Sequence, residues 1–136
     1  MLSAICKDFI GSSLWNLGKT DAALTYHQEA RDKTEKILGK KNIYYADAQN
    51  NVATAQFRLG KIEECLPLFA ESKTIRYELF GDQHPAYSVS LNNLAFVSNR
   101  LAKYEEAEIL YKEALAIREQ KSVSYTHLTL PTIYSV

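Results

Sequence analysis

The sequence predicts an all-α fold, an α-solenoid made of three stacked helix–turn–helix repeats. Three observations lead to this prediction. The chain of 136 residues aligns with itself without gaps at a shift of 42 residues. Its apolar residues recur at spacings of three and four, and glycines fall at matching breaks. Such self-similarity is typical of repeat proteins, in which each helix pair buries its apolar faces against its neighbours.

The three repeats span about residues 1–41, 42–83 and 84–121. The second and third are the most alike, with identities that include Asn50/Asn92, Asn51/Asn93, Ala53/Ala95, Arg58/Arg100, Glu64/Glu106 and Arg76/Arg118. The first repeat matches more weakly, through Leu17/Leu59, Gly18/Gly60 and Lys19/Lys61. Each repeat is therefore expected to adopt the same pair of helices.

Glycines divide each repeat into two helices. Gly18 and Gly60 fall where a first helix turns into a second, and glycine supplies the left-handed residue that such ends favour. Gly39 and Gly81 end the second helices of repeats one and two in the same way. Pro85 then opens the third repeat, because proline is tolerated in the first turn of a helix.

Helical periodicity is clearest in the third repeat. Apolar residues follow helical spacing over 86–101 and again over 104–118, and neither segment alternates like a strand. Two residues depart from the pattern. Ala102 stands where the other repeats have the turn glycine, and Pro67 lies inside a predicted helix, where it should remove a hydrogen bond or bend the helix.

Small residues recur where paired helices must approach closely, and large residues recur beside them. The small ones are Gly11/Ala53/Ala95, Ala23/Cys65/Ala107 and Ala30/Ser72/Ala114. The large ones are Ile10/Val52/Leu94 and His27/Phe69/Tyr111. Because interlocking helix pairs at native packing density need this alternation, we expect these residues to form the core.

Residues 84–119, HPAYSVSLNNLAFVSNRLAKYEEAEILYKEALAIRE, closely resemble the tetratricopeptide repeats of kinesin light chains. The second repeat keeps NNVA, LGKIEE and TIRYELFG, and the first keeps LGKTDAAL and KILG. The resemblance covers about residues 2–121 and implies a right-handed superhelix. Lys33 and Thr34 replace the Ile-Arg pair of the other repeats, so repeat one is either degenerate or a cap.

The resemblance also implies that the first helices line a concave groove that holds an extended peptide. The groove residues would be Asn16, Asn50, Arg58, Asn92, Phe96, Asn99 and Arg100. Asn50 and Asn92 match asparagines that hold the peptide backbone, a task that suits an amide because it both donates and accepts. Arg58 and Arg100 would pair with carboxylates of a partly acidic segment. Alternatively, they are solvated helix ends favoured by the helix dipole.

Aromatic residues would supply the apolar part of this groove. Trp15, Phe57 and Phe96 offer area for one or two ligand side chains, although Trp15 and Phe57 suit the core equally well. Asn51 and Asn93, in contrast, are expected to form hydrogen bonds from helix to helix.

Composition argues against several other functions. Sixteen basic and sixteen acidic residues cancel, so no nucleic-acid or membrane partner is expected. The two cysteines are too few for a disulfide framework or a metal-ligand cluster. With no signal peptide in view, we expect a cytoplasmic chain.

Catalysis is not expected from this sequence. It has no phosphate-cradling glycine loop, no HExxH and no paired-carboxylate signature. As candidates for nucleophile and base, Cys65 and His27 both fall at core positions, where a free cysteine behaves as a hydrophobe. We therefore expect no enzyme activity, no cofactor, no metal and no small-molecule substrate. The leading hypothesis is a peptide-binding adaptor or scaffold. The alternatives are a regulatory or sensor array of a larger signalling ATPase or protease, and a structural spacer without a ligand.

Residues 122–136, SVSYTHLTLPTIYSV, break the pattern of the body. They contain no Lys, Arg, Asp or Glu, and they are rich in β-branched residues. They resemble spurious translation of adapter sequence at the ends of predicted proteins. The alternative is a native disordered or strand-forming tail. We expect a non-helical tail and, on the first interpretation, a fragment of a longer repeat protein.

Overall fold

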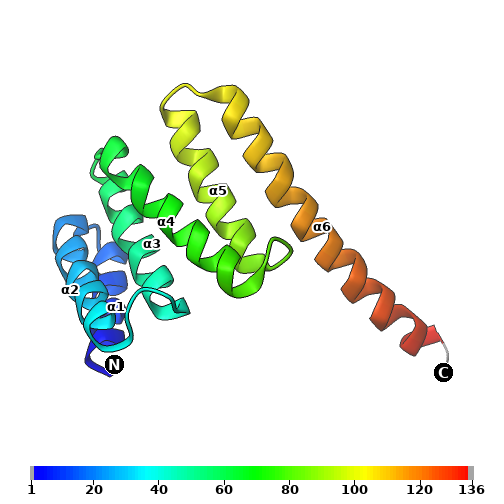
Figure 1. Cartoon of the computed structure of the whole chain (residues 1–136), viewed down its shortest axis with the longest axis horizontal. Helices are drawn as coiled ribbons and strands as arrows, with labels where there is room; N and C mark the ends of the chain where they lie inside the picture. Colours follow the sequence, from blue (N-terminus) through cyan, green and yellow to red (C-terminus); the bar gives the residue numbers. More distant parts are fainter. Residues whose placement is uncertain (1, 135–136) are drawn as a thin grey trace.

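The chain folds into a row of six α-helices. The structure, a computed structural model, describes the backbone of residues 2–134 and the side chains of residues 4–7 and 9–119. The helices are α1 (Leu2–Asn16), α2 (Thr20–Leu38), α3 (Ile43–Arg58), α4 (Ile62–Phe80), α5 (Pro85–Arg100) and α6 (Tyr104–Tyr134). Each helix packs against the next, so three hairpins lie side by side (Figure 1). No strand occurs in the described part, and the predicted all-α solenoid is confirmed.

The turns inside the three hairpins close in the same way. In each, the backbone N–H of the lysine after the turn donates to the carbonyl five residues earlier, with N–O distances of 2.8 Å at Lys19, 2.9 Å at Lys61 and 2.8 Å at Lys103. This geometry requires a left-handed residue, and Gly18 and Gly60 supply it at φ of +79° and +82°. Ala102 takes the same role at φ of 62°. A side-chain-bearing residue pays roughly 1–2 kcal/mol for this conformation.

Side chains cap the helices that open repeats two and three. The Asn42 side chain accepts a hydrogen bond from the backbone N–H of Tyr45 at 2.9 Å and donates to the carbonyl of Gly39 at 2.8 Å. At the next junction, Nδ1 of His84 accepts from the backbone N–H of Ala86 at 3.0 Å, and Pro85 occupies the first turn. Both junctions therefore fix where α3 and α5 begin.

The predicted ladder of small residues forms the core between the hairpins. All nine small positions are buried, from Gly11 on α1 to Ala114 on α6. Gly11 shows why size matters, because a Cβ added there would lie 2.8 Å from Nε2 of His27. Large side chains such as Phe69 and Val52 fill the space beside the small ones. The core prediction is confirmed for these residues.

The prediction of a core position is wrong for two residues. Ile10 on α1 is 44% exposed and Tyr111 on α6 is 36% exposed, although the residues at matching positions of the other repeats are buried. Ile10 faces the side where no helix pair precedes it in the described residues, and Tyr111 faces the side where none follows. Repeat symmetry predicts the position of a residue on its helix but not whether a neighbour covers it.

The helix α4 runs through Pro67 without ending. Pro67 is exposed and lies in the second turn of this helix. Because proline has no N–H, the carbonyl of Glu63 has no donor four residues later. As expected, Pro67 removes one helical hydrogen bond, but α4 continues beyond it to Phe80.

The expectation of a non-helical tail is wrong, because α6 continues through residues 122–134 to Tyr134. Once a helix has formed, adding a residue costs only the ordering of that residue, because no new helix nucleus is needed. No glycine lies between Tyr104 and Tyr134, and the first proline is Pro131. The β-branched residues of this segment are only weak helix formers and do not terminate a helix.

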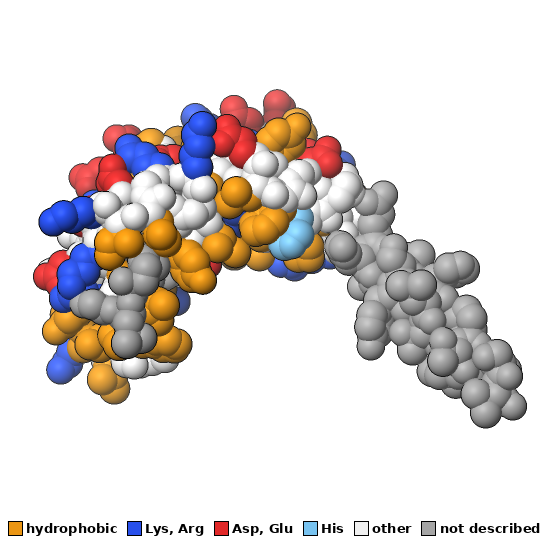
Figure 2. All heavy atoms as spheres, turned by 60° about the horizontal axis from the view of Figure 1, so that its bottom comes forward, with side chains coloured by type: hydrophobic (Ala, Val, Ile, Leu, Met, Phe, Trp, Pro, Cys, Tyr) orange, Lys and Arg blue, Asp and Glu red, His pale blue; other side chains and the backbone are white. Residues whose placement is uncertain are grey.

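The whole row of helices forms an arch. Figure 2, turned so that the bottom of Figure 1 comes forward, shows charged side chains mainly along the upper, outer edge and hydrophobic side chains along the lower, inner edge. In this view, exposed hydrophobic side chains are thus most frequent along the inner edge of the arch.

Candidate functional site

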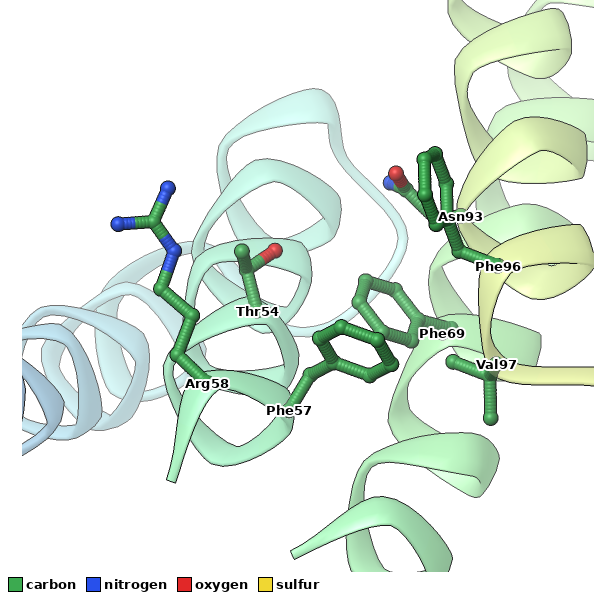
Figure 3. Close-up of a pocket in the computed structure, with 7 residues that line it drawn as sticks. All are labelled: Thr54, Phe57, Arg58, Phe69, Asn93, Phe96 and Val97. Atoms are coloured by element: carbon green, nitrogen blue, oxygen red, sulfur yellow. The ribbon is translucent and has the colours of Figure 1, made fainter. Parts of the chain in front are cut away.

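A cavity of about 270 Å³ lies between α3 and α5, the first helices of repeats two and three. Its lining residues are Thr54, Phe57 and Arg58 from α3, Phe69 from α4, and Asn93, Phe96 and Val97 from α5. In Figure 3 the rings of Phe57 and Phe69 lie toward one another between the helices. The cavity lies between two of the three first helices that were expected to line the groove.

The cavity has an apolar floor and an open rim. Phe69 and Val97 are buried in the core between α4 and α5, so they form the floor. Phe96 stands at the rim with 56% of its surface exposed. Its ring meets the ring of Tyr111 edge to face, with 6.1 Å between the centroids. This contact with α6 restricts where the exposed ring can lie.

Arg58, which lines the cavity, and Arg100, which does not, stack on aromatic rings of the preceding repeat. The guanidinium carbon of Arg58 lies 4.1 Å from the centroid of the Trp15 ring. That of Arg100 lies 5.5 Å from the centroid of the Phe57 ring. Both arginines are exposed last residues of their helices. Each arginine is thus an exposed helix end, as the second interpretation expected, and in addition forms a contact between repeats.

An asparagine pair joins α3 to α5 beside the cavity. Nδ2 of Asn93 donates to Oδ1 of Asn50 at 2.7 Å, which confirms the helix-to-helix role predicted for Asn93. Asn50 is half-buried, and its amide hydrogens are not used by this bond. The pair thus orients Asn50 with its carbonyl toward α5 and leaves its donors for other acceptors.

The remaining predicted groove residues lie apart from this cavity. Asn92 is half-buried in a second hollow of about 520 Å³, which it shares with Phe96, Tyr111, Leu115 and Arg118. Asn16 and Asn99 are exposed near the ends of α1 and α5 and do not line the cavity. Of the seven predicted residues, only Arg58 and Phe96 line the cavity together, with Asn50 bonded to its wall.

Arg76 on α4 is a buried arginine that contacts α3. The sequence showed it only as part of the repeat pattern. Arg76 on α4 is 6% exposed. Its Nη2 lies 2.9 Å from Oδ1 of Asp47, and its Nη1 donates to Oγ of Ser90 at 2.9 Å. The contact with Ser90 links α4 to α5 of the next repeat. The recurrence of Arg76 as Arg118 was visible in the sequence, but this partner set was not.

The buried thiol does not provide a nucleophile. Burial raises the pKa of Cys65 to about 11, so this thiol stays protonated at neutral pH. It donates to the carbonyl of Ile62 at 3.0 Å. Burial, with the Glu71 carboxylate nearby, likewise raises the pKa of Tyr45 to about 12. Both groups are core residues whose neutral form is favoured.

Two other kinds of site were sought in the described part of the chain. No group of three histidine, cysteine or acidic side chains comes close enough together there to hold a metal ion. Nor does any helix within that part combine the length and apolar character needed to cross a membrane.

Comparison with known proteins gives the family. The model of the tetratricopeptide repeat family matches residues 3–64 and 44–120. No curated protein sequence matches the chain. One similar solved structure is that of the nearly identical TPR-like repeats of a Podosopora anserina protein assigned as a kinesin light chain, with a TM-score of 0.78 and 18% identity over 85% of this chain and 55% of that chain. Another is BtubC (BKLC) from P. vanneervenii, with a TM-score of 0.81 and 20% identity over 86% of this chain and 46% of that chain.

At these identities the solved structures show the fold alone, and this chain spans about half the length of each. Tetratricopeptide repeats are in general modules of protein–protein interaction. The sequence match covers nearly all of the described helices, and the solved structures carry the same hairpin stack. The chain therefore belongs to the tetratricopeptide repeat family, with repeats of the kinesin light chain-like kind.

Proposed function

We propose that the face formed by α1, α3 and α5 binds an extended segment of a partner protein, so that the chain acts as an adaptor or scaffold. The observation that carries this proposal is the cavity between α3 and α5, which has an apolar floor and an arginine at its rim. A cavity of about 270 Å³ suits one apolar side chain of a ligand, not a whole folded domain.

Each kind of groove residue has a separate task in this proposal. Phe96, which is both exposed and held by Tyr111, contacts the apolar anchor at the rim of the cavity. The free amide hydrogens of Asn50 donate to a backbone carbonyl of the segment. Asn92 performs the same task one repeat later, and Asn16 and Asn99 bind at the ends of the groove.

The charges of the groove favour an acidic segment. The stacked guanidinium groups of Arg58 and Arg100 keep their N–H edges for carboxylates, because stacking uses only the faces of the group. Asp47, an acidic residue on α3 like Arg58, is already paired with Arg76. Among the side chains of α1, α3 and α5 that the structure describes, positive groups therefore outnumber negative ones, although the whole chain is neutral.

The cytoplasm is the proposed location. Two free cysteines and zero net charge support a reducing compartment and a protein partner, with no nucleic acid or membrane surface involved.

The test is selection from a display library of random extended peptides on the full chain. We expect enrichment of peptides with acidic residues beside one aromatic or aliphatic residue. The variant Arg58→Glu/Arg100→Glu should lose these peptides, and Phe96→Ala should lose the apolar preference but keep the acidic one.

The matched control is Lys36→Glu/Lys41→Glu, which makes the same change of charge at exposed positions outside the groove. It should select the same peptides as the parent. Enrichment that is equal for the groove variant and the control would overturn the proposal, as would a parent that enriches nothing. Thermal melts of every variant show whether the fold is retained.

A further inference from the structure

Two polar contacts join α3 to α5 beside the cavity of the candidate site. The first is the hydrogen bond from Nδ2 of Asn93 to Oδ1 of Asn50, at 2.7 Å. The second runs through Arg76 of α4, whose Nη2 lies 2.9 Å from Oδ1 of Asp47 on α3 and whose Nη1 donates to Oγ of Ser90 on α5 at 2.9 Å. We call this second contact, Asp47–Arg76–Ser90, the arginine bridge.

The two contacts and the cavity follow one another along the same two helices. Asp47 and Ser90 come first, and the asparagine pair lies three residues later on each helix. Four residues further on, Thr54 and Val97 line the cavity (Figure 3). At 3.6 residues per turn, the arginine bridge thus lies about two turns from the cavity on both helices. The helices are joined before and near their midpoints, and the cavity opens between their second halves.

The guanidinium group of Arg76 is buried, but its hydrogen bonds are incomplete. The residue is 6% exposed, and its Nε has no hydrogen-bond partner among the described residues. Its one further contact is long, from Nη1 to the carbonyl of Ala86 on α5 at 3.4 Å. A buried ion of this kind contributes little net stability, because the cost of removing it from water offsets its contacts. What the bridge supplies is one defined arrangement of α3 and α5, since the partners on both helices must lie within reach of a single planar group.

The junction between repeats one and two is linked in a different way. At the position that matches Arg76, repeat one has Thr34, whose hydroxyl donates to the carbonyl of Ala30 in its own helix at 2.8 Å. A longer link joins this junction, from Nη1 of Arg31 on α2 to Oε1 of Gln49 on α3 at 3.3 Å. Arg31 is also paired with the exposed Asp32. Arg31 therefore offers a matched control, because it joins neighbouring repeats but does not join the two walls of the cavity.

We propose that the arginine bridge fixes the width of the cavity and thereby decides which apolar side chain of a bound segment the cavity accepts. Arg76 is then a positioning residue, because it does not line the cavity itself. Since it concerns the anchor of a bound segment, this inference rests on the proposed function. Walls held at a fixed separation discriminate roughly tenfold or more between side chains that differ by one methylene. Walls that move adapt to several sizes and lose this discrimination.

The test variant is Arg76→Met/Asp47→Asn, which removes the bridge together with one charge of each sign. It should fold, because an apolar side chain of similar length is tolerated in place of a buried ion and Asp47 is half exposed. The matched control is Arg31→Met/Asp32→Asn, which makes the same changes at the other junction. Ser90→Ala is a milder variant that removes only the shorter contact of Arg76 with α5, and it carries the test if the double variant does not fold. Circular dichroism and thermal melts show which variants are folded.

The first experiment measures the separation of hairpins two and three without a ligand. Spin labels are attached to the full chain at Lys61→Cys and Lys103→Cys, two exposed and matching turn positions, in a Cys6→Ser background. The buried Cys65 stays unlabelled. Double electron–electron resonance then gives the distribution of distances between the labels. The test variant should broaden this distribution, Ser90→Ala should broaden it less, and the control should match the parent.

The second experiment repeats the selection from the display library of random extended peptides with the same variants. The parent should favour one size of apolar anchor over its neighbours by roughly tenfold. The test variant should lose most of this ratio. It should keep the preference for acidic residues, because Arg58, Arg100 and the total charge of the chain are unchanged. The control should keep both preferences.

The outcomes separate the role of the bridge from the proposed function. A parent that enriches no peptide overturns the proposed function, and the role of the bridge in anchor choice falls with it. A parent that enriches acidic peptides, together with a test variant that keeps the same anchor ratio, overturns the role of the bridge alone. A distance distribution that is unchanged in the test variant, or equally broadened in the control, overturns it as well. Broadening and loss of anchor discrimination in the test variant but not in the control support it.

Discussion

The guanidinium of Arg58 lies over the indole of Trp15, with 4.1 Å between the guanidinium carbon and the ring centroid, and connects repeat two to repeat one. The same relation recurs one repeat later between Arg100 and Phe57. Each contact spans 43 residues of sequence, one more than the repeat length. Arginines of the candidate groove therefore also hold neighbouring repeats together, and this double role can be measured.

Replacing Arg58 with alanine should lower the free energy of unfolding by about 0.5–1 kcal/mol, because the guanidinium no longer stacks on Trp15. The same change in a Trp15→Leu background should cost clearly less, since the stacking partner is already gone. Urea unfolding of the four proteins of this cycle measures the coupling. Arg118→Ala, an exposed arginine on α6, is the control. Equal losses in both backgrounds would show that the stacking contributes nothing.

Ala102→Gly should raise the free energy of unfolding by about 1 kcal/mol, because Ala102 holds a left-handed backbone at φ of 62°. Gly60→Ala, the reverse change at the matching turn, should lower it by a similar amount. Thermal and urea melts of both variants provide the check. A destabilised Ala102→Gly would mean that the alanine side chain makes a contact worth more than the strain.

Pro67→Ala should stabilise the chain by roughly 1–3 kcal/mol, because it restores a donor to the carbonyl of Glu63 inside α4. Pro67 is exposed, so no core packing is lost. Pro85→Ala serves as the comparison, since proline in the first turn of α5 removes no helical hydrogen bond and should change stability little. The prediction fails if both substitutions have the same effect on urea unfolding.

Alkaline pH should destabilise the fold through Cys65 and Tyr45. Burial raises the pKa of Cys65 from 9.0 to about 11 and that of Tyr45 from 10.0 to about 12. The folded chain thus keeps protons that the unfolded chain releases earlier. The contribution of these groups is complete below pH 9 and is lost as the pH rises through the folded-state pKa values. Urea unfolding across this range should show a shallower loss for Cys65→Ala than for the parent.

Shortening the chain to residues 1–121 should leave the melting temperature unchanged or higher. This prediction rests on the sequence, because residues 122–136 lack the repeat pattern that forms the core over residues 4–117. Differential scanning calorimetry of the short and full chains makes the comparison. A clear drop on shortening would show that residues 122–136 pack against the repeats.

The repeat ladder was predictable because local size and spacing determine it. Gly11, Ala53 and Ala95 could be placed from their recurrence alone, since each must let a neighbouring helix approach. Asn93 could be assigned to a helix-to-helix hydrogen bond for the same reason, and it donates to Asn50. The small positions recur with the hairpins, and all nine of them are buried.

The contacts that depend on the ends or on the twist of the row were not predictable. Ile10 and Tyr111 match buried residues, but their exposure depends on what lies beyond them in space. The stacking of Arg58 on Trp15 and the hydrogen bond from Arg76 to Ser90 depend on how far one hairpin rotates against the next. The continuation of α6 into residues 122–134 reflects extension of a formed helix and not the composition of that segment.

The stacking of arginines on aromatic rings occurs twice and always runs in the same direction along the repeats. Each arginine reaches back to the preceding repeat, the first repeat has Asn16 at the arginine position, and the third has Asn99 at the aromatic position. In the part of the chain that the structure describes, only Arg58 and Arg100 therefore stack on aromatic rings one repeat apart. Under the proposed function, a segment with one carboxylate has two binding registers of similar energy. A segment with two carboxylates at the matching separation has a single register, so its position and direction on the chain are fixed together.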